Sequence, residues 1–369
     1  MRMRISAGVL TIAAAMMWLT TNTAGQQAGS VSTAKPAATT AKPAAATPAT
    51  AAKPGARSYK APRTPDGQPD LGGFWSNATY TPLERPNNVT KEFYTPEEFS
   101  KLRRERQAAD EEQTTPGTTN DVHYDFTQFG LDKSQHTIVQ NLRTSQIIDP
   151  PDGKVPPITA EAQQRAQARA AEQKGRGQTW QYERVQNMPT GSRCIMMGGA
   201  GPPLRDAGYN STYHIVQGQG NVMVLTEMIH DARIIPLDNR PAPPAGLQQW
   251  VGMSRGHWEG ETLVVETTNF NGRNPVNPGG RGAGAAASSE HVKITERFTR
   301  VSDEQIEYKY TVDDPHTWTK PWTALNYLQK TNGPIFEFAC HETNYGVANI
   351  LAGAREDEKK AAQKSGGSK

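Results

Sequence analysis

The sequence predicts a mainly β protein. A C-terminal antiparallel sheet, closed into a lipocalin-like barrel or folded as a sandwich, is strapped by an irregular, partly helical N-terminal half. Three observations support this fold class. Short apolar runs follow one another between residues 209 and 354, turn signals separate them, and no helical pattern comes between them.

The N-terminus has the residue order of a secretory signal peptide over residues 1–24. Two arginines precede the uncharged apolar run Ile5–Leu19, and Ala24 offers a small residue for cleavage. Because this run is shorter than the roughly 20 residues that span a bilayer, we expect a cleaved signal rather than a membrane anchor. The mature protein would then be periplasmic or secreted, with no stable membrane span.

A disordered linker is predicted over residues 25–60. Residues 33–54 contain only Ala, Thr, Pro and Lys. Such a segment cannot bury enough apolar surface to offset the entropy of ordering it. We therefore expect a tether between the export signal and the folded part of the chain.

Residues 61–208 predict an irregular region that wraps the sheet and has no core of its own. Thr95-Pro96-Glu97-Glu98 combines an N-cap, a first-turn proline and a glutamate at N3, and predicts a helix to about Glu112. An alanine-rich helix should run from near Thr159 to Gly175. Between the two helices, the proline pairs of Arg143–Thr159 suit an extended strap laid over the domain.

The C-terminal half, residues 209–354, should contain the strands of the sheet. A tight turn at His257–Glu261 leads into one of them, and a glycine-rich loop at Gly272–Ser289 interrupts the series. Residues 355–369 are expected to form a disordered tail. The predicted strands are Asn221–Ile229, Thr262–Phe270, His291–Val301, Gln305–Val312, Pro321–Lys330 and Ile335–Cys340.

Four of these strands place a glutamate in a row with apolar residues, because alternate residues share a face. A carboxylate on a core-facing row is costly unless it is paired or lines a wet cavity. Arginines nearby in the sequence could pair with these groups structurally. Alternatively, the carboxylates line a polar cavity, where burial raises their proton affinity and suits them to acid–base chemistry. An error of one residue in register would invert the face. The glutamates are Glu227, Glu266, Glu296 and Glu337, and the arginines are Arg233, Arg255, Arg297 and Arg300.

Candidate site residues gather near the predicted strand ends. His230 and Asp231 could act as a base and the carboxylate that orients it, or His230 could simply satisfy a buried carbonyl. The tryptophans could stack on a ligand or close the end of the barrel. The candidate catalytic residues are Glu227, His230, Asp231, Glu266, Glu296 and His341. The candidate substrate-binding residues are Arg233, Arg255, Trp258, Trp318 and Trp322.

Cys194 and Cys340 are the two cysteines of the chain. In an oxidising compartment they would form a disulfide that joins the wrapping half to the sheet half. The alternative is that Cys340, next to His341, is a nucleophile. However, neighbouring residues of a strand point to opposite faces.

The sequence contains no motif that indicates a metal, a nucleotide cofactor or a nucleic-acid partner. His230, His257, His341 and Glu266 have no metal-ligand spacing, so no metal is predicted. The chain has no GxSxG elbow, P-loop or dinucleotide fingerprint, so no cofactor is predicted either. With 40 basic and 37 acidic residues, the formal charge of +3 gives no reason to expect a nucleic-acid partner.

Long strings of the chain resemble a large family of exported hypothetical proteins that is abundant in soil bacteria, notably Acidobacteria. The resemblance covers about Thr64 to Arg355 and implies export and a shared layout, but it transfers no catalytic residue. The glycine-rich stretch Gly279–Ala287 is longer than the family pattern. The strings are RTSQIIDPPDGKVPPIT, EMIHDARIIP, SRGHWEGETLVVETTNF, ERFTR, DDPHTWTKPWT and ACHETNYGVANILAGAR.

These observations favour an exported small-molecule enzyme that uses carboxylate and histidine acid–base chemistry. A hydrolase, lyase or isomerase acting on a sugar-like or amphipathic substrate would suit the residues. The alternatives are a non-catalytic lipocalin-like binding protein, with paired glutamates, and a structural protein of the cell envelope. The substrate and the oligomeric state stay open.

Overall fold

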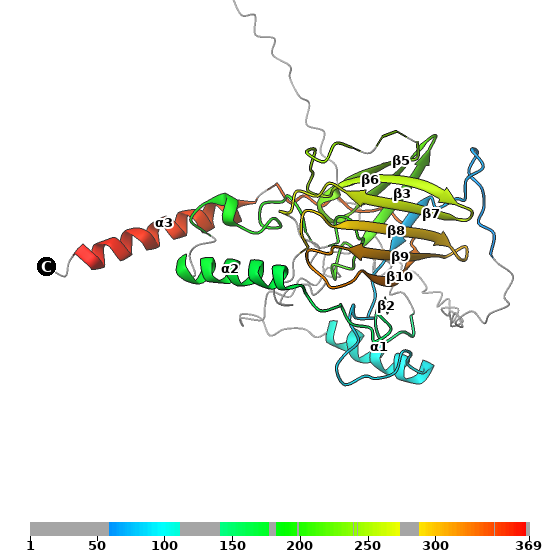
Figure 1. The fold of residues 1–369 in the computed structure, drawn as a ribbon, viewed down its shortest axis with the longest axis horizontal. Coiled ribbons are helices and arrows are strands. Elements are labelled where there is room, and N and C mark those ends of the chain that lie inside the picture. Colours follow the sequence, from blue (N-terminus) through cyan, green and yellow to red (C-terminus); the bar gives the residue numbers. More distant parts are fainter. Residues whose placement is uncertain are drawn as a thin grey trace, which may run out of the picture. The chain divides into compact units, whose positions relative to one another are not determined.

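Nine antiparallel strands form a sheet that winds into a nearly closed barrel. Figure 1 shows the strands from β6 to β10 side by side. The computed structural model describes residues 59–110, 141–176, 182–197, 199–238, 240–241, 243–273, 288–342 and 344–366. The strands are hydrogen-bonded in the order β5-β4-β3-β1-β10-β9-β8-β7-β6. The predicted fold class is therefore confirmed. The strands are β1 (Gly73–Ser76), β3 (Thr212–Gly218), β4 (Asn221–Thr226), β5 (Ala232–Pro236), β6 (Met253–Glu259), β7 (Thr262–Thr268), β8 (Lys293–Arg300), β9 (Gln305–Asp313) and β10 (Trp322–Lys330).

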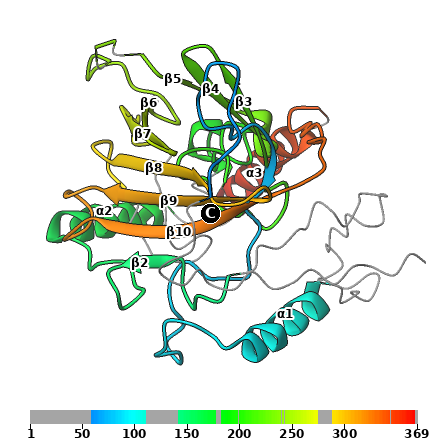
Figure 2. The ribbon, with the colours of Figure 1, turned by 90° about the vertical axis from the view of Figure 1, so that its right-hand side faces the viewer.

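The strands β6 to β10 follow one another around the sheet in chain order (Figure 2). β8 and β9 alternate strictly between buried and partly exposed residues, as predicted, so that Ile294, Glu296 and Phe298 point inward. The turn between these strands falls within Val301–Glu304, which agrees with the predicted strands His291–Val301 and Gln305–Val312 to within one residue. The period-two pattern therefore identifies the inner face of β8 and β9 correctly.

The barrel stays open at one seam, between β5 and β6, where no ladder of hydrogen bonds is formed. Side chains close this seam. A Cβ atom on Gly256 of β6 would lie 2.8 Å from Ile235 Cγ2 of β5 and 2.8 Å from Leu237 Cδ2. The absence of a side chain at Gly256 thus lets the two edge strands pack closely.

β1 comes from the region that we expected only to wrap the sheet. It lies between β3 and β10, with Trp75 opposite both Tyr213 and Lys330. The strap prediction holds for the segment that follows residue 143. Its short strand β2 (Ile147–Asp149) pairs with β10, and Ile158 bridges to Trp318. The N-terminal half therefore contributes both a barrel strand and a strap.

In the described part of the chain, three α-helices accompany the sheet: α1 (Pro96–Asp110), α2 (Ala160–Arg176) and α3 (Tyr345–Gly366). The predicted capping box of α1 is confirmed. The Glu98 amide donates to Thr95 Oγ1 (3.2 Å), and the Thr95 amide donates to Glu98 Oε2 (2.8 Å). The prediction of a disordered tail from residue 355 is wrong as far as Gly366, because α3 continues to that residue.

The barrel interior is filled by side chains. One apolar cluster extends through it, with Phe298, Tyr308, Tyr310, Trp322 and Trp318 in successive ring contacts. This packing distinguishes the chain from a barrel that carries a ligand inside.

Several strand boundaries differ from those predicted. β4 ends at Thr226, and residues 331–340 contain no strand. The segment Met253–Glu259 is a strand, so the turn is confined to Gly260 and Glu261. The predicted signal peptide, nearly all of the linker, the expected end of the first helix at Glu112, and residues 274–287 of the glycine-rich loop lie outside the described residues.

Candidate functional site

The turn after β4 carries three of the predicted site residues: Glu227, His230 and Asp231. It is closed by the Thr226 amide, which donates to the Asp231 carbonyl (2.8 Å). Ile229 and His230 have φ values of 62° and 46°. The left-handed region is unfavourable for a β-branched residue such as Ile229. Strain of this kind costs about 1–3 kcal/mol per residue, and it clusters at functional sites.

Other strained residues lie in neighbouring segments. Among the described residues, the non-glycine residues with positive φ are Cys194, Asn210, Ile229, His230 and Asn269. Asn210 is hydrogen-bonded to Glu227, and Cys194 and Asn269 lie close in sequence to residues that line a common hollow. The backbone strain is therefore concentrated around this hollow.

The hollow has a volume of about 360 Å³. It lies at the end of the open seam where β5 and β6 both start. Asp231 precedes β5, Gln248–Val251 precede β6, and Asn271 follows β7. Ile195, Met196 and Ile229 add apolar side chains to the wall. Among the described lining residues, Asp231 is the one with an ionisable side chain.

Asn269 fixes the loop that supplies most of this wall. Its Nδ2 donates to the carbonyls of Pro244 (2.8 Å) and Leu247 (2.9 Å). The Gln249 amide donates to the Asn269 carbonyl, and the Asn271 amide donates to the Gln249 carbonyl, each at 2.9 Å. Gln249 and its neighbour Trp250 are thus held by backbone bonds to the end of β7.

Burial alters the proton affinity of two carboxyl groups at this end of the barrel. It raises the pKa of Asp231, an effect that the charge of Arg233 partly opposes. It also raises the pKa of Glu227, which is 1% exposed. Asn210 Nδ2 donates to one oxygen of Glu227 (2.6 Å), whereas the other oxygen has no partner. Both groups therefore keep their protons to a higher pH than ordinary carboxyls do.

The disulfide predicted between Cys194 and Cys340 is confirmed, with the Cα atoms 5.7 Å apart. It joins the segment before Ile195, which lines the hollow, to the segment that carries His341. His230 Nδ1 lies 2.9 Å from the Phe338 carbonyl, and the rings of His230 and His341 are 6.4 Å apart at their centroids. Oxidation of Cys340 excludes the alternative in which its thiol is a nucleophile.

Glu296 does not line a cavity with Glu227. It is fully buried inside the barrel, where the guanidinium of Arg233 binds both of its oxygens and the Tyr308 hydroxyl donates to Oε1 (2.8 Å). The structural ion pair, one of the two alternatives, is thus confirmed for Glu296. Arg233 is occupied by this contact and does not line the hollow.

Glu266 lies on the outer face of the barrel, where it pairs with Lys293. Its predicted inward position is wrong by one residue, because the inward row of β7 contains Leu263, Val265 and Thr267. Arg255 is opposite Glu266 in register and donates to the Pro241 carbonyl (2.9 Å). Neither residue lines the hollow.

Two similar predictions also fail. Glu337 belongs to no strand. β4 ends at Thr226, so Glu227 lies after the strand and is not part of its inner row. Within β4, Thr226 faces inward and Leu225 does not.

The three tryptophans proposed to bind substrate are part of the core. Trp318 and Trp322 are 1% and 0% exposed and pack edge to face, with ring centroids 5.8 Å apart. Trp258 packs against the same cluster. Burial of Trp318 and Trp322 in the core excludes the other alternative, in which they stack on a ligand. The hollow is lined by Trp250 instead, which was not among the predicted substrate-binding residues.

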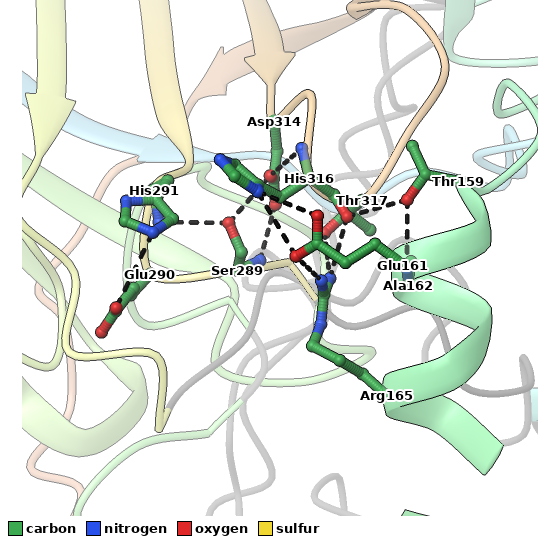
Figure 3. Close-up of polar contacts among 10 residues, drawn as sticks. All are labelled: Thr159, Glu161, Ala162, Arg165, Ser289, Glu290, His291, Asp314, His316 and Thr317. Atoms are coloured by element: carbon green, nitrogen blue, oxygen red, sulfur yellow. Dashed lines mark hydrogen bonds and ion pairs between the residues drawn. The ribbon is translucent and has the colours of Figure 1, made fainter. Parts of the chain in front are cut away.

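A second polar cluster was not predicted. Figure 3 shows His291 and His316 side by side, with Glu161 of α2 against His316. No local sequence motif indicates this cluster, because its members come from three separate segments. Among the described residues, no group of three or more His, Cys, Asp or Glu side chains is arranged to hold a metal.

Comparison of the chain with protein-family models, with curated proteins and with solved structures finds no match. The functional proposal therefore rests on the geometry of the hollow beside Asp231.

Proposed function

We propose that the hollow beside Trp250 binds a sugar-like small molecule and that Asp231 moves a proton on it, so that the protein is an isomerase or a lyase. The observation that carries this proposal is the position of Asp231. Its carboxyl has a raised pKa and lines a hollow of about 360 Å³ bounded by strained backbone. The ligand is placed here because side chains fill the barrel interior.

The remaining lining residues suit a polyhydroxylated ligand. Trp250 offers an aromatic surface of the kind on which sugar rings stack. The amides of Gln248, Gln249 and Asn271 can both donate to and accept from hydroxyl groups. The combination of an aromatic ring, amides and one carboxyl suits a hydroxylated ligand.

The single titratable group in the described wall favours isomerisation or elimination over hydrolysis. Glycoside hydrolysis ordinarily uses two carboxyl groups flanking the scissile bond. In aldose–ketose isomerisation, one base removes the proton from the hydroxyl-bearing carbon next to the carbonyl and returns it to the carbonyl carbon. The hydroxyl proton passes to the former carbonyl oxygen, so no atom is gained or lost. A carboxylate with a raised pKa is a stronger base for this step than an ordinary one.

Deuterium exchange would test this proposal. The full chain is incubated in D2O with a panel of aldoses and ketoses, and loss of the proton next to the carbonyl is followed by proton NMR. We expect enzyme-dependent exchange for at least one sugar, its loss in Asp231→Asn, and its retention in Glu266→Gln, whose side chain lies on the outer face. Exchange that persists in Asp231→Asn would overturn the assignment of the base.

Binding needs a separate measurement. We expect Trp250→Ala to weaken binding of the same sugar about tenfold, in line with one lost aromatic contact, and the exposed Tyr345→Ala to leave it unchanged. Binding without exchange in the wild type would show a non-catalytic binding protein. If the wild type shows neither binding nor exchange with any sugar of the panel, the proposal of a sugar-like ligand is wrong.

We also propose that the protein is exported, with cleavage after Ala24. The Cys194–Cys340 disulfide is typical of oxidising compartments. None of the helices in the described part of the chain is long and apolar enough to cross a bilayer. Intact-mass measurement of protein recovered from the periplasm should give a chain that begins at Gly25 and lacks two hydrogens. A retained N-terminus would contradict cleavage.

A further inference from the structure

His291 and His316 lie against each other at the end of the barrel. The centroids of their rings are 4.7 Å apart, and the planes are tilted by 38°. His291 precedes β8 and His316 follows β9, and the register that places Lys293 opposite Asp313 keeps these two ends adjacent. Both side chains are accessible, with 60% and 45% of their surface exposed. Two imidazoles are therefore presented together to solvent by neighbouring strands.

Buried Asp314 holds the backbone on both sides of this pair. Its carboxylate accepts from the Ser289 hydroxyl (2.8 Å), from the Ser289 amide (2.6 Å) and from the His316 amide (3.1 Å). The Ser289 hydroxyl in turn accepts from the His291 amide (3.1 Å). This network, drawn in Figure 3, orders both histidines before any ligand arrives.

Glu161 of α2 determines the orientation of the His316 ring. Its oxygens lie 3.1 and 3.3 Å from His316 Nδ1. Arg165 holds Glu161 in turn, with Nη1 2.7 Å from Oε1, and Nη2 donates to the His316 carbonyl (3.1 Å). With Nδ1 of His316 engaged by a carboxylate, Nε2 is left as the basic nitrogen of the ring.

We propose that His291 and His316 bind a divalent transition-metal ion of the zinc class, and that Glu161 is the carboxylate that orients the His316 ligand. Imidazole nitrogen is a preferred ligand of Zn²⁺, Cu²⁺ and Ni²⁺, whereas Mg²⁺ and Ca²⁺ prefer oxygen. Histidines that bind metals almost always donate their other ring nitrogen to a carboxylate or carbonyl, the arrangement seen at His316.

Water completes the coordination in this proposal, because the described residues contain no three-ligand group. Glu290 Oε1 lies 3.8 Å from His291 Nε2 and supplies a nearby negative charge. The positive charge of Arg165 is offset by its pairing with Glu161. The site is thus an open, two-histidine site on the protein surface, separate from the hollow at Asp231.

Zinc titration of the full chain tests the proposal. Protein treated with EDTA and then freed of it is titrated with ZnCl2 by calorimetry at about pH 7.5. We expect one ion per chain. His291→Gln and His316→Gln should each abolish measurable binding. Glu161→Gln should weaken it about 10- to 100-fold, as loss of an orienting carboxylate does at other metal sites.

His257→Gln is the matched control. His257 is exposed and also sits beside a carboxylate, with Nε2 3.2 Å from Glu259 Oε1, but it has no second imidazole next to it. This variant should bind zinc as the wild type does. Far-ultraviolet circular dichroism and thermal unfolding of each variant establish that the fold is retained.

Proton–nitrogen-15 correlation NMR of the imidazole rings shows independently which histidines of the wild type bind zinc. Zinc should shift the ring signals of His291 and His316 and leave those of His257 and His214 in place. The proposal is overturned if zinc does not bind in one-to-one ratio, if binding survives in the His291→Gln/His316→Gln double variant, or if His257→Gln lowers affinity as much as His316→Gln.

Discussion

The guanidinium of Arg233 on β5 pairs with the carboxylate of Glu296 on β8 across the inside of the barrel, with Nη2 3.1 Å from Oε1. β5 borders the open seam, and β8 lies beyond β6 and β7 on the other side of it. The ion pair therefore links the two sides of a seam that has no hydrogen-bond ladder. Its role is to hold the barrel together rather than to react with a ligand.

Glu296→Gln should lower the free energy of unfolding by about 3–5 kcal/mol, because it leaves the charge of Arg233 buried without its partner. Urea denaturation measures the change. Glu266→Gln is the control: the same substitution one strand away removes an exposed pair with Lys293 and should cost no more than about 1 kcal/mol. Equal effects in the two variants would contradict a structural role for the buried pair.

Glu227→Gln should make the protein more stable at neutral pH and leave it unchanged at low pH. The native carboxyl has a raised pKa, so it keeps its proton where the unfolded chain has released it. The native state therefore loses stability as the pH rises from the unfolded pKa, about 4.3, to the raised native pKa. Gln carries no ionisable proton and avoids this loss.

Urea denaturation of wild type and Glu227→Gln across this pH range isolates the contribution of Glu227. The difference should grow with pH and then level off, by about 1.4 kcal/mol for each unit by which the pKa is raised. A difference that stays constant with pH would show that the Glu227 carboxyl titrates normally in the folded protein.

Replacing both cysteines by serine should destabilise the protein by about 3–5 kcal/mol, because the disulfide closes a loop between positions 146 residues apart. The double variant avoids a free thiol. Wild type in reducing buffer should unfold at the same urea concentration as the variant in either buffer. Stability that does not respond to reduction would mean that the disulfide adds little to the fold.

Gly256→Val should destabilise the barrel by about 1–3 kcal/mol by overpacking the seam against Ile235 and Leu237. Gly218→Val is the control, because a Cβ at Gly218 meets no atom within 4 Å. It should change stability by less than about 0.5 kcal/mol. If both variants are equally stable, the close packing of β5 on β6 does not contribute to closing the barrel.

Local patterns in the sequence predicted those parts of the fold that local physics determines. The alternation in β8 and β9 and the capping box before Pro96 depend on neighbouring residues, and the structure confirms both. The disulfide could be predicted because the chain has only two cysteines, which can pair in one way. β1 was missed because its four residues, GFWS, become a strand only through pairing with β3 and β10.

The candidate sites depend on long-range pairing and could be predicted only in part. Glu227, His230 and Asp231 are adjacent in sequence, so their grouping was visible. The inward position predicted for Glu266 was wrong. Leu263, Val264 and Val265 are consecutive apolar residues, so the sequence does not show which of the two faces of β7 is buried. His291, His316 and Glu161 meet only because the register of β8 on β9 and the placement of α2 bring three distant segments together.

The position of β1 determines when the barrel can be completed. Trp75 near the start of the folded region lies opposite Lys330 of the last strand, so β1 gains its second partner only after almost the whole chain is available. Pairings this distant in sequence make folding slow. A chain cut before β10 would leave β1 and β9 as open edges, which invite pairing with other chains. Synthesis of the polypeptide must therefore have passed β10 before the sheet can close.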